Sequence, residues 1–133
     1  MYGKRESRLD KVARRNLEKA EERLDAARLL LENGKYEDSI NRAYYSMYHS
    51  AMALLQTEGV SPKTHKGLIG EFGKRFVKTG KIDRRFSTML THAESLRESA
   101  DYGIEPEIKS EDAEKVVKNA EKFLKMTRKR ASD

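Results

Sequence analysis

The chain has 133 residues, no cysteine and two prolines, and its 28 Lys and Arg against 22 Asp and Glu give a net charge of +6. This length fits one domain with its own core, and the lack of cysteine excludes disulfides, thiolate metal sites and cysteine nucleophiles. No apolar run reaches the roughly 18 residues of a membrane span, and the first residues lack the apolar stretch of a secretory signal. We therefore expect a soluble, cytoplasmic protein.

The positive charge is concentrated in the middle of the chain. Residues 60–92 carry eight basic and two acidic side chains, an excess of +6 that equals the net charge of the whole protein. Such a block favours an anionic partner, with nucleic acid first. A solvated basic surface without a partner is the alternative interpretation.

Apolar residues recur at steps of three and four, which predicts helices throughout. The first apolar stripe runs from Leu9 to Leu31 and ends at Asn33-Gly34, where glycine favours a helix stop. The second helix begins near Glu37 and stops at Glu58-Gly59.

The third segment, from His65 to Phe76, keeps a helical period but carries Gly67, Gly70 and Gly73. These glycines predict either a face for close approach of another backbone or a partly irregular segment. Two further helices follow, and we expect Asp83 and Ser110 to cap them.

The sequence thus predicts an all-α protein, an antiparallel up-and-down bundle of four to five helices with short loops. We expect a single domain over residues 1–133, with its core at about 8–127 and a frayed basic tail at 128–133.

The second helix has an unusual outer face. At 100° per residue, Arg42 and His49 fall about 180–200° from the apolar centre of the helix, where a surface helix normally carries Lys and Glu. Arg42 is the only formal charge between residues 42 and 56. The helix is therefore either central in the bundle or covered by another subunit. We favour a homodimer through this helix, because a two-fold contact is the commonest way to cover such a face.

Arg42 and His49 are seven residues apart and point the same way, about 10.5 Å apart along the axis. Arginine can hold a phosphate by two hydrogen bonds, and histidine is suited to proton transfer near neutral pH. The pair is suited to metal-free RNA cleavage, in which histidine activates the ribose 2′-hydroxyl. Tyr45 could orient His49 or stack on a base, and Asn41 and Ser46 are further polar candidates.

Several segments together are similar to the HEPN family (higher eukaryotes and prokaryotes nucleotide-binding domain), in its small stand-alone prokaryotic branch. The resemblance begins in Asn41-Arg42-Ala43-Tyr44-Tyr45-Ser46-Met47-Tyr48-His49, and it covers most of residues 10–126. The other matching segments are Lys63–Leu68, Phe72–Ile82, Leu96-Arg97 and Asp101-Tyr102-Gly103.

The resemblance implies a helical bundle that dimerises around the Arg/His helix. Many members are metal-independent ribonucleases with an Arg-x(4–6)-His motif at the dimer cleft, and Arg42 and His49 fit its long end. Many are toxins encoded beside a minimal nucleotidyltransferase antitoxin. Some are silenced when that partner adds AMP to a tyrosine two residues after the histidine. That position is Ala51 here, and nothing in the sequence selects Tyr45, Tyr48 or Tyr102 as a substitute.

Other residues are open to more than one interpretation. His65 and Lys66 could contact RNA, although packing or capping suits His65 better, and Tyr102 could end a helix or bury its hydroxyl near the cleft. The spacing of the histidines argues against a metal site, and no cofactor is expected. Besides a toxin-type endoribonuclease, the sequence allows a noncatalytic module that binds a nucleotide or a nucleotidyltransferase, or a structural adaptor.

Overall fold

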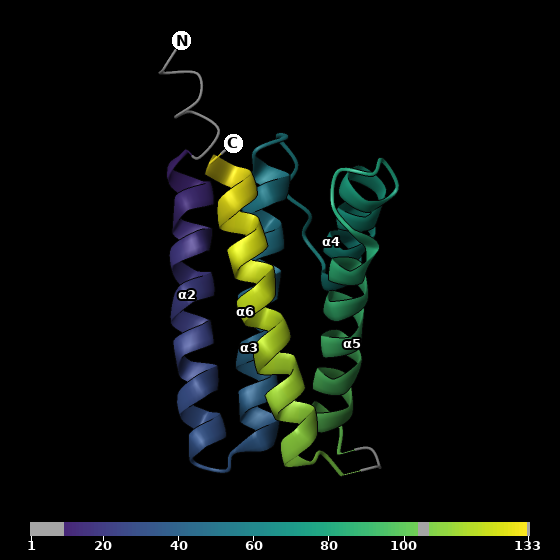
Figure 1. The fold of residues 1–133 in the computed structure, drawn as a ribbon. Helices are drawn as coiled ribbons and strands as arrows, with labels where there is room; N and C mark the ends of the chain where they lie inside the picture. The colour runs from purple at the N-terminus through teal and green to yellow at the C-terminus, as the bar shows by residue number, and fades with distance from the viewer. Residues whose placement is uncertain (1–9, 104–106, 133) are drawn as a thin grey trace.

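The computed structural model describes residues 10–103 and 107–132, and all regular structure in these residues is helical (Figure 1). The predicted all-helical fold is therefore confirmed. The helices are α2 (Lys11–Glu32), α3 (Tyr36–Gln56), α4 (His65–Phe72), α5 (Arg84–Asp101) and α6 (Ser110–Ser132), with a π-helical turn η2 (Gly73–Val77) after α4.

The long helices α2, α3, α5 and α6 run alternately down and up, so the bundle is antiparallel (Figure 1). Helix α3 is central, because α2, α4, α5 and α6 all pack against it. Its inner face buries Ile40, Tyr44, Met47 and Leu55, while Phe72 of α4 stacks 5.4 Å from Phe123 of α6. None of the described helices combines the length and the apolar character that a membrane crossing requires.

Helices α2 and α3 meet along a seam of small residues. On α2, Ala13, Ala20 and Ala27 are fully buried at seven-residue spacing. On α3, the buried Ser39 and Ser46 hydroxyls donate to the carbonyls of Ala27 and Ala20, each at 2.8 Å. A seven-residue repeat keeps one face of each helix on its neighbour, so the seam fixes the register between the two helices.

The helix ends differ in part from expectation. Gly34 has φ +72° at the turn between α2 and α3, and Asp83 caps α5 by accepting from the Arg85 amide at 2.8 Å. The prediction that Ser110 caps the last helix is wrong, because Ser110 is already helical. Instead, the Asp112 side chain accepts from the amide of Lys109 at 2.9 Å.

The glycine-rich third segment is partly irregular, with a regular helix over His65–Phe72 and a π-helical turn after it. After Phe72 the backbone widens into η2, where the Lys78 amide donates to the Gly73 carbonyl five residues back. A Cβ on Gly67 would lie 2.8 Å from Oγ1 of Thr64, which is the cap of the same helix and not another backbone. A Cβ on Gly70 would meet nothing within 4 Å, and one on Gly73 would lie 3.9 Å from a serine hydroxyl. The irregular alternative is thus the correct one.

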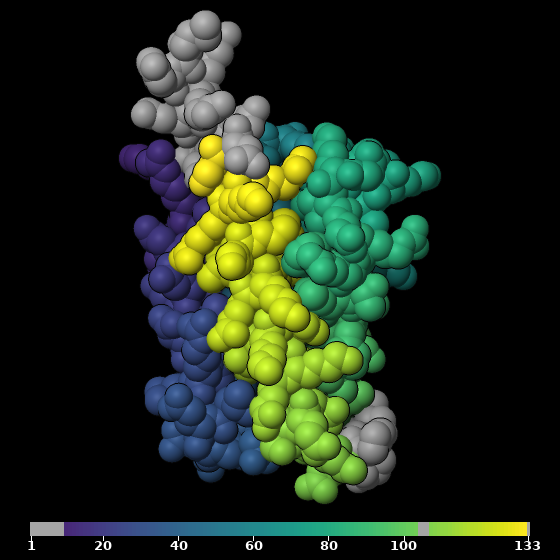
Figure 2. Space-filling view, in the orientation of Figure 1, coloured from purple at the N-terminus to yellow at the C-terminus, as the bar shows by residue number. Residues whose placement is uncertain are grey.

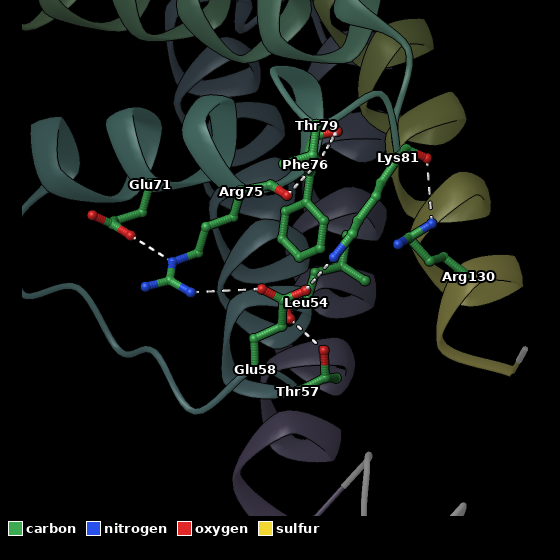
Figure 3. A network of polar contacts seen from close by, with 9 residues as sticks. All are labelled: Leu54, Thr57, Glu58, Glu71, Arg75, Phe76, Thr79, Lys81 and Arg130. Carbon is green, nitrogen blue, oxygen red and sulfur yellow. Dashed lines mark hydrogen bonds and ion pairs between the residues drawn. The ribbon is translucent and has the colours of Figure 1, made fainter.

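The C-terminal residues up to Ser132 are helical, so the prediction that they are frayed is wrong. Arg130 donates to the carbonyl of Lys81 at 3.3 Å and covers the Phe76 ring. Figure 3 shows this contact beside a chain of ion pairs in which Glu58, at the end of α3, faces both Arg75 and Lys81. Tertiary contacts therefore hold the last turn of α6.

Candidate active site

His49 is held by a residue of the neighbouring helix. Its Nδ1 lies 2.8 Å from Oδ1 of Asn16 on α2. The Asn16 amide nitrogen donates to Oε1 of Gln56 at 2.9 Å and to the carbonyl of Val12 at 3.2 Å. The link crosses the α2–α3 seam, so the packing of the two helices positions the imidazole.

These contacts determine which His49 nitrogen carries the hydrogen. A backbone carbonyl only accepts, so the Asn16 nitrogen faces Val12 and the Asn16 oxygen faces His49. An amide oxygen also only accepts, so Nδ1 of His49 must donate. In the neutral imidazole, Nε2 then holds the lone pair.

The surroundings keep His49 neutral. Burial lowers the pKa of His49 to about 4, and the charges of Arg23 and Lys19 on α2 act in the same direction. A neutral imidazole at pH 7 can take a proton but has none to give from Nε2. The imidazole is therefore in the unprotonated form that a general base requires, and its lowered pKa makes it a weaker base than an unperturbed histidine.

Arg42 lies two turns before His49 on the same helix and is exposed. It makes no ion pair or side-chain hydrogen bond with the residues described, so its guanidinium is available to an anion. Towards the C-terminal end of α3 the outer face is no longer exposed, because Met52 and Ala53 are buried by other parts of the same chain. Thus α3 is central in the bundle, as one of the two sequence interpretations proposed, and its exposed outer face centres on Arg42.

Half-buried aromatic side chains continue the site from His49 towards α4. The Tyr48 ring lies 5.3 Å from the His49 ring and 5.0 Å from the His65 ring. Tyr45 packs 5.6 Å from His65 and 6.5 Å from His49. Flat rings at this exposure can stack on bases.

His65 packs against the inner side of this cluster. Its Nδ1 lies 2.8 Å from the Tyr44 hydroxyl and 4.0 Å from Glu94 of α5. Glu94 in turn binds Arg97 at 2.6 Å, and Arg97 covers the Tyr44 ring at 5.2 Å. Burial, helped by the Glu94 charge, raises the pKa of Tyr44, so its hydroxyl stays protonated. These contacts favour the packing interpretation of His65.

The remaining predicted residues are not all near His49. Ser46 is fully buried against Ala20 and cannot reach a ligand. Lys66 is exposed on α4, and Asn41 is half-buried beside Arg42. Tyr102 is 75% exposed at the end of α5, so the alternative of a buried hydroxyl is wrong.

Sequence reasoning missed the contribution of α2. Asn16, Lys19 and Arg23 recur at steps of three and four, which places them on one stripe of the helix. That stripe reaches His49 through Asn16, and the two cations lie close enough to lower the pKa of the imidazole. The spacing is visible in the sequence, but only the packing of the helices shows that this stripe borders α3. Within the described residues, no group of three or more His, Cys, Asp or Glu is placed to hold a metal ion.

Comparison with known proteins shows which family and which relatives this chain is similar to. The model of the HEPN domain family matches residues 13–130. A protein named "Putative toxin" from Methanocaldococcus jannaschii is 42% identical over 113 residues, covering 85% of this chain and 84% of its own. A second protein of that name from the same organism is 37% identical, with 85% and 77% covered. A UPF0332 protein from Thermotoga maritima is 34% identical, with 86% and 87% covered.

Proposed function

The chain belongs to the HEPN domain family, and on that premise we propose that it is a metal-independent endoribonuclease of the toxin type, with Arg42 and His49 as its catalytic residues. One observation carries the proposal. The Asn16 contact leaves the lone pair on Nε2 of His49, on the same helix as the exposed Arg42. A base and a phosphate-binding cation are the two groups that cleavage of RNA by its own 2′-hydroxyl needs.

The proposed step uses each group once. Nε2 of His49 takes the proton of the 2′-hydroxyl while the 2′-oxygen forms a bond to phosphorus. The bond from phosphorus to the 5′-oxygen breaks, and water supplies the proton for that oxygen. The Arg42 guanidinium hydrogen-bonds the non-bridging phosphate oxygens and offsets the negative charge that develops on them. Lys19 and Arg23 add positive potential where the phosphate would lie.

We further propose that two copies of the chain form the cleft. Arg42 is exposed in the single chain, and about 10.5 Å of helix axis separates it from His49. A substrate spanning both residues would lie on an open surface unless another wall faced it. A second α3, related by a two-fold axis, supplies that wall and brings two Arg42–His49 pairs together.

The names of the two Methanocaldococcus relatives support a toxin role and hence an antitoxin partner. We propose a nucleotidyltransferase as that partner. The residue two positions after His49 is Ala51, which is fully buried and has no hydroxyl that could accept AMP. AMP transfer to that position therefore cannot silence this chain.

RNA cleavage in excess EDTA tests the function. Purified wild type is compared with Arg42→Ala and His49→Ala, and His92→Ala on α5 serves as the matched control. We expect wild type and His92→Ala to cleave RNA and the other two variants to lose about a hundredfold or more in rate. Equal cleavage by all four proteins would contradict the assignment. Absence of cleavage, combined with ligand binding, would favour the noncatalytic module.

A further inference from the structure

A basic groove lies between α5 and α6, away from the candidate active site. It has a volume of about 570 Å³. Figure 2 shows the face on which these two helices lie side by side. His49, in contrast, lies where α3 meets α2. The groove is therefore a second surface, which the proposed chemistry does not use.

The groove combines cations with an apolar floor. Its floor comprises Ile82, Phe86, Met89 and Met126, and Asp83 is its one acidic residue. Six cations line it, namely Lys81, Arg85, Lys122, Lys125, Lys129 and Arg130. This balance of charge favours an anionic ligand that also presents flat or apolar groups.

The charges on α6 are divided between two sides of the helix. On the side towards α2, Glu121 pairs with Arg28 at 2.8 Å, and Arg128 pairs with Glu21. Lys122 and Lys129 lie on the side towards α5, and Lys125 lies between the two sides, because it also borders the hollow next to α2. All three lysines are exposed and have no ion pair with any described residue. Lys81, on the opposite side of the groove, pairs with Glu58 at 3.4 Å, so the charge left without an ion pair among the described residues includes that of these three α6 lysines.

These three lysines form a row rather than a cluster. Steps of three and four residues place them on one face of α6, about 4.5 and 6 Å apart along the axis. A single phosphate would contact only part of this row. A nucleic-acid strand repeats its charge along its length and carries bases that can lie on an apolar floor.

We propose that the α5–α6 groove binds the backbone of an RNA strand and so holds the substrate away from the site of cleavage. This inference rests on the proposed function for the identity of its ligand. The lysines contact phosphates, and the apolar floor accommodates bases without reading their sequence. Binding in the groove is accordingly strongly dependent on salt and weakly dependent on sequence.

Binding of a fluorescent single-stranded RNA oligonucleotide tests the groove. The measurement uses full-length His49→Ala protein, so that no cleavage interferes, and fluorescence anisotropy at several salt concentrations. The groove variant adds Lys122→Gln, Lys125→Gln and Lys129→Gln. The matched control adds Lys11→Gln, Lys35→Gln and Lys109→Gln, which removes the same charge from exposed positions elsewhere.

We expect the groove variant to bind about tenfold more weakly, as the loss of three exposed ion pairs of ordinary strength would give. The slope of log K against log salt falls by about 2, at about 0.7 per lost phosphate contact. The control keeps the affinity and slope of its parent. Unchanged binding by the groove variant, or an equal loss in both triple variants, would overturn the inference.

This test is independent of catalysis. If wild type cleaves no RNA but the groove variant alone loses binding, the groove assignment stands and the proposed nuclease function fails. If His49→Ala abolishes cleavage while the groove variant binds RNA normally, the nuclease function stands and the groove assignment fails.

Discussion

At the scale of single residues, the central feature is the hydrogen bond between Asn16 and His49. The Asn16 amide nitrogen donates to Gln56 and to the Val12 carbonyl. Its oxygen is therefore directed at the imidazole of His49, which it orients. In the proposed function Asn16 is a positioning residue, because it contacts His49 and not the substrate. Such supporting contacts commonly affect activity by about 10- to 100-fold.

Two substitutions of Asn16 test whether its contact with His49 affects catalysis. We expect Asn16→Ala to lower the cleavage rate by about 10- to 100-fold, because the imidazole loses its fixed tautomer and orientation. Asn16→Asp keeps an acceptor for Nδ1 and adds a negative charge that raises the His49 pKa. That variant should retain more activity, with the acid side of its pH–rate profile shifted to higher pH. A wild-type rate and pH profile for Asn16→Ala would show that the contact has no catalytic role.

The low pKa of His49 predicts how stability changes with pH. The pKa is about 4 in the folded chain, against about 6.5 for an unperturbed histidine. Between these values the unfolded state binds more protons, so folding stability falls as pH decreases from 6.5 towards 4. Urea unfolding at pH 7 and pH 5 should therefore show a larger loss for wild type than for His49→Gln. Equal losses in the two proteins would contradict the lowered pKa.

At the scale of helices, the α2–α3 seam keeps the site in register. Ala20 and Ser46 are both fully buried there, and their backbone-to-hydroxyl contact is 2.8 Å. Asn16 lies one turn before Ala20 on the same helix. A change in the spacing of the two helices would therefore move Asn16 relative to His49.

A larger residue in the seam tests this coupling. We expect Ala20→Leu to destabilise the protein by about 1–3 kcal/mol, because added methylenes in a packed interior force backbone shifts. The cleavage rate should fall by more than the decrease in the fraction of folded protein, because Asn16 also moves relative to His49. The matched control is Arg14→Leu on the exposed side of α2, which should change the free energy of unfolding by less than about 0.5 kcal/mol. Urea unfolding gives the free energy of unfolding, and single-turnover cleavage gives the activity. Similar values for the two variants would contradict the role of the seam.

Most elements could be predicted from the sequence because helical periodicity and capping act locally. The first helix stops at Gly34, and Asp83 caps α5, as the local chemistry indicates. The glycines after His65 indicate an irregular segment but not its π-helical form, and the cap of α6 differs from expectation within a few residues of Ser110. The ordered end of α6 depends on a tertiary contact, because Arg130 binds the carbonyl of Lys81, which is distant in sequence.

For the proposed site, the sequence points to two residues of α3 and gives no sign of the residue of α2 that contacts one of them. Arg42 and His49 stand out because their residue types do not suit the outer face of a surface helix. Asn16 does not stand out, because polar residues are common on the surface of a helix. Its role becomes visible only when the structure shows that this side of α2 faces α3. Ser46 is not available as a ligand-binding residue, because its buried hydroxyl donates to the Ala20 carbonyl in the seam, a contact that spacing does not reveal.

At the scale of the whole molecule, two surfaces have separate tasks in the proposed function. The outer face of α3 carries Arg42 and His49. The groove between α5 and α6 carries Lys122, Lys125 and Lys129, which form no ion pair within the part of the chain that the structure describes. None of the residues that line the groove comes from α3, so a dimer through α3 does not require the groove residues as part of its interface. One RNA molecule could then contact the cleft and a groove together.

The dimer itself is directly measurable. We expect sedimentation equilibrium at micromolar concentration to give twice the chain mass of 15.3 kDa. The physical reason is the row of half-buried aromatic side chains beside Arg42, which a second α3 would cover. A monomer at these concentrations would remove the second wall from the proposed cleft, and it would require catalysis on an open surface.

The chemistry of the RNA ends tests the central claim most directly. If His49 activates the 2′-hydroxyl, mass spectrometry of RNA cleaved by wild type in excess EDTA will find a 2′,3′-cyclic phosphate and a 5′-hydroxyl at each cut. A single 2′-deoxynucleotide on the 5′ side of the cleaved bond will block cleavage there. Products with a 3′-hydroxyl and a 5′-phosphate would show attack by water instead, and they would contradict the roles given to Arg42 and His49.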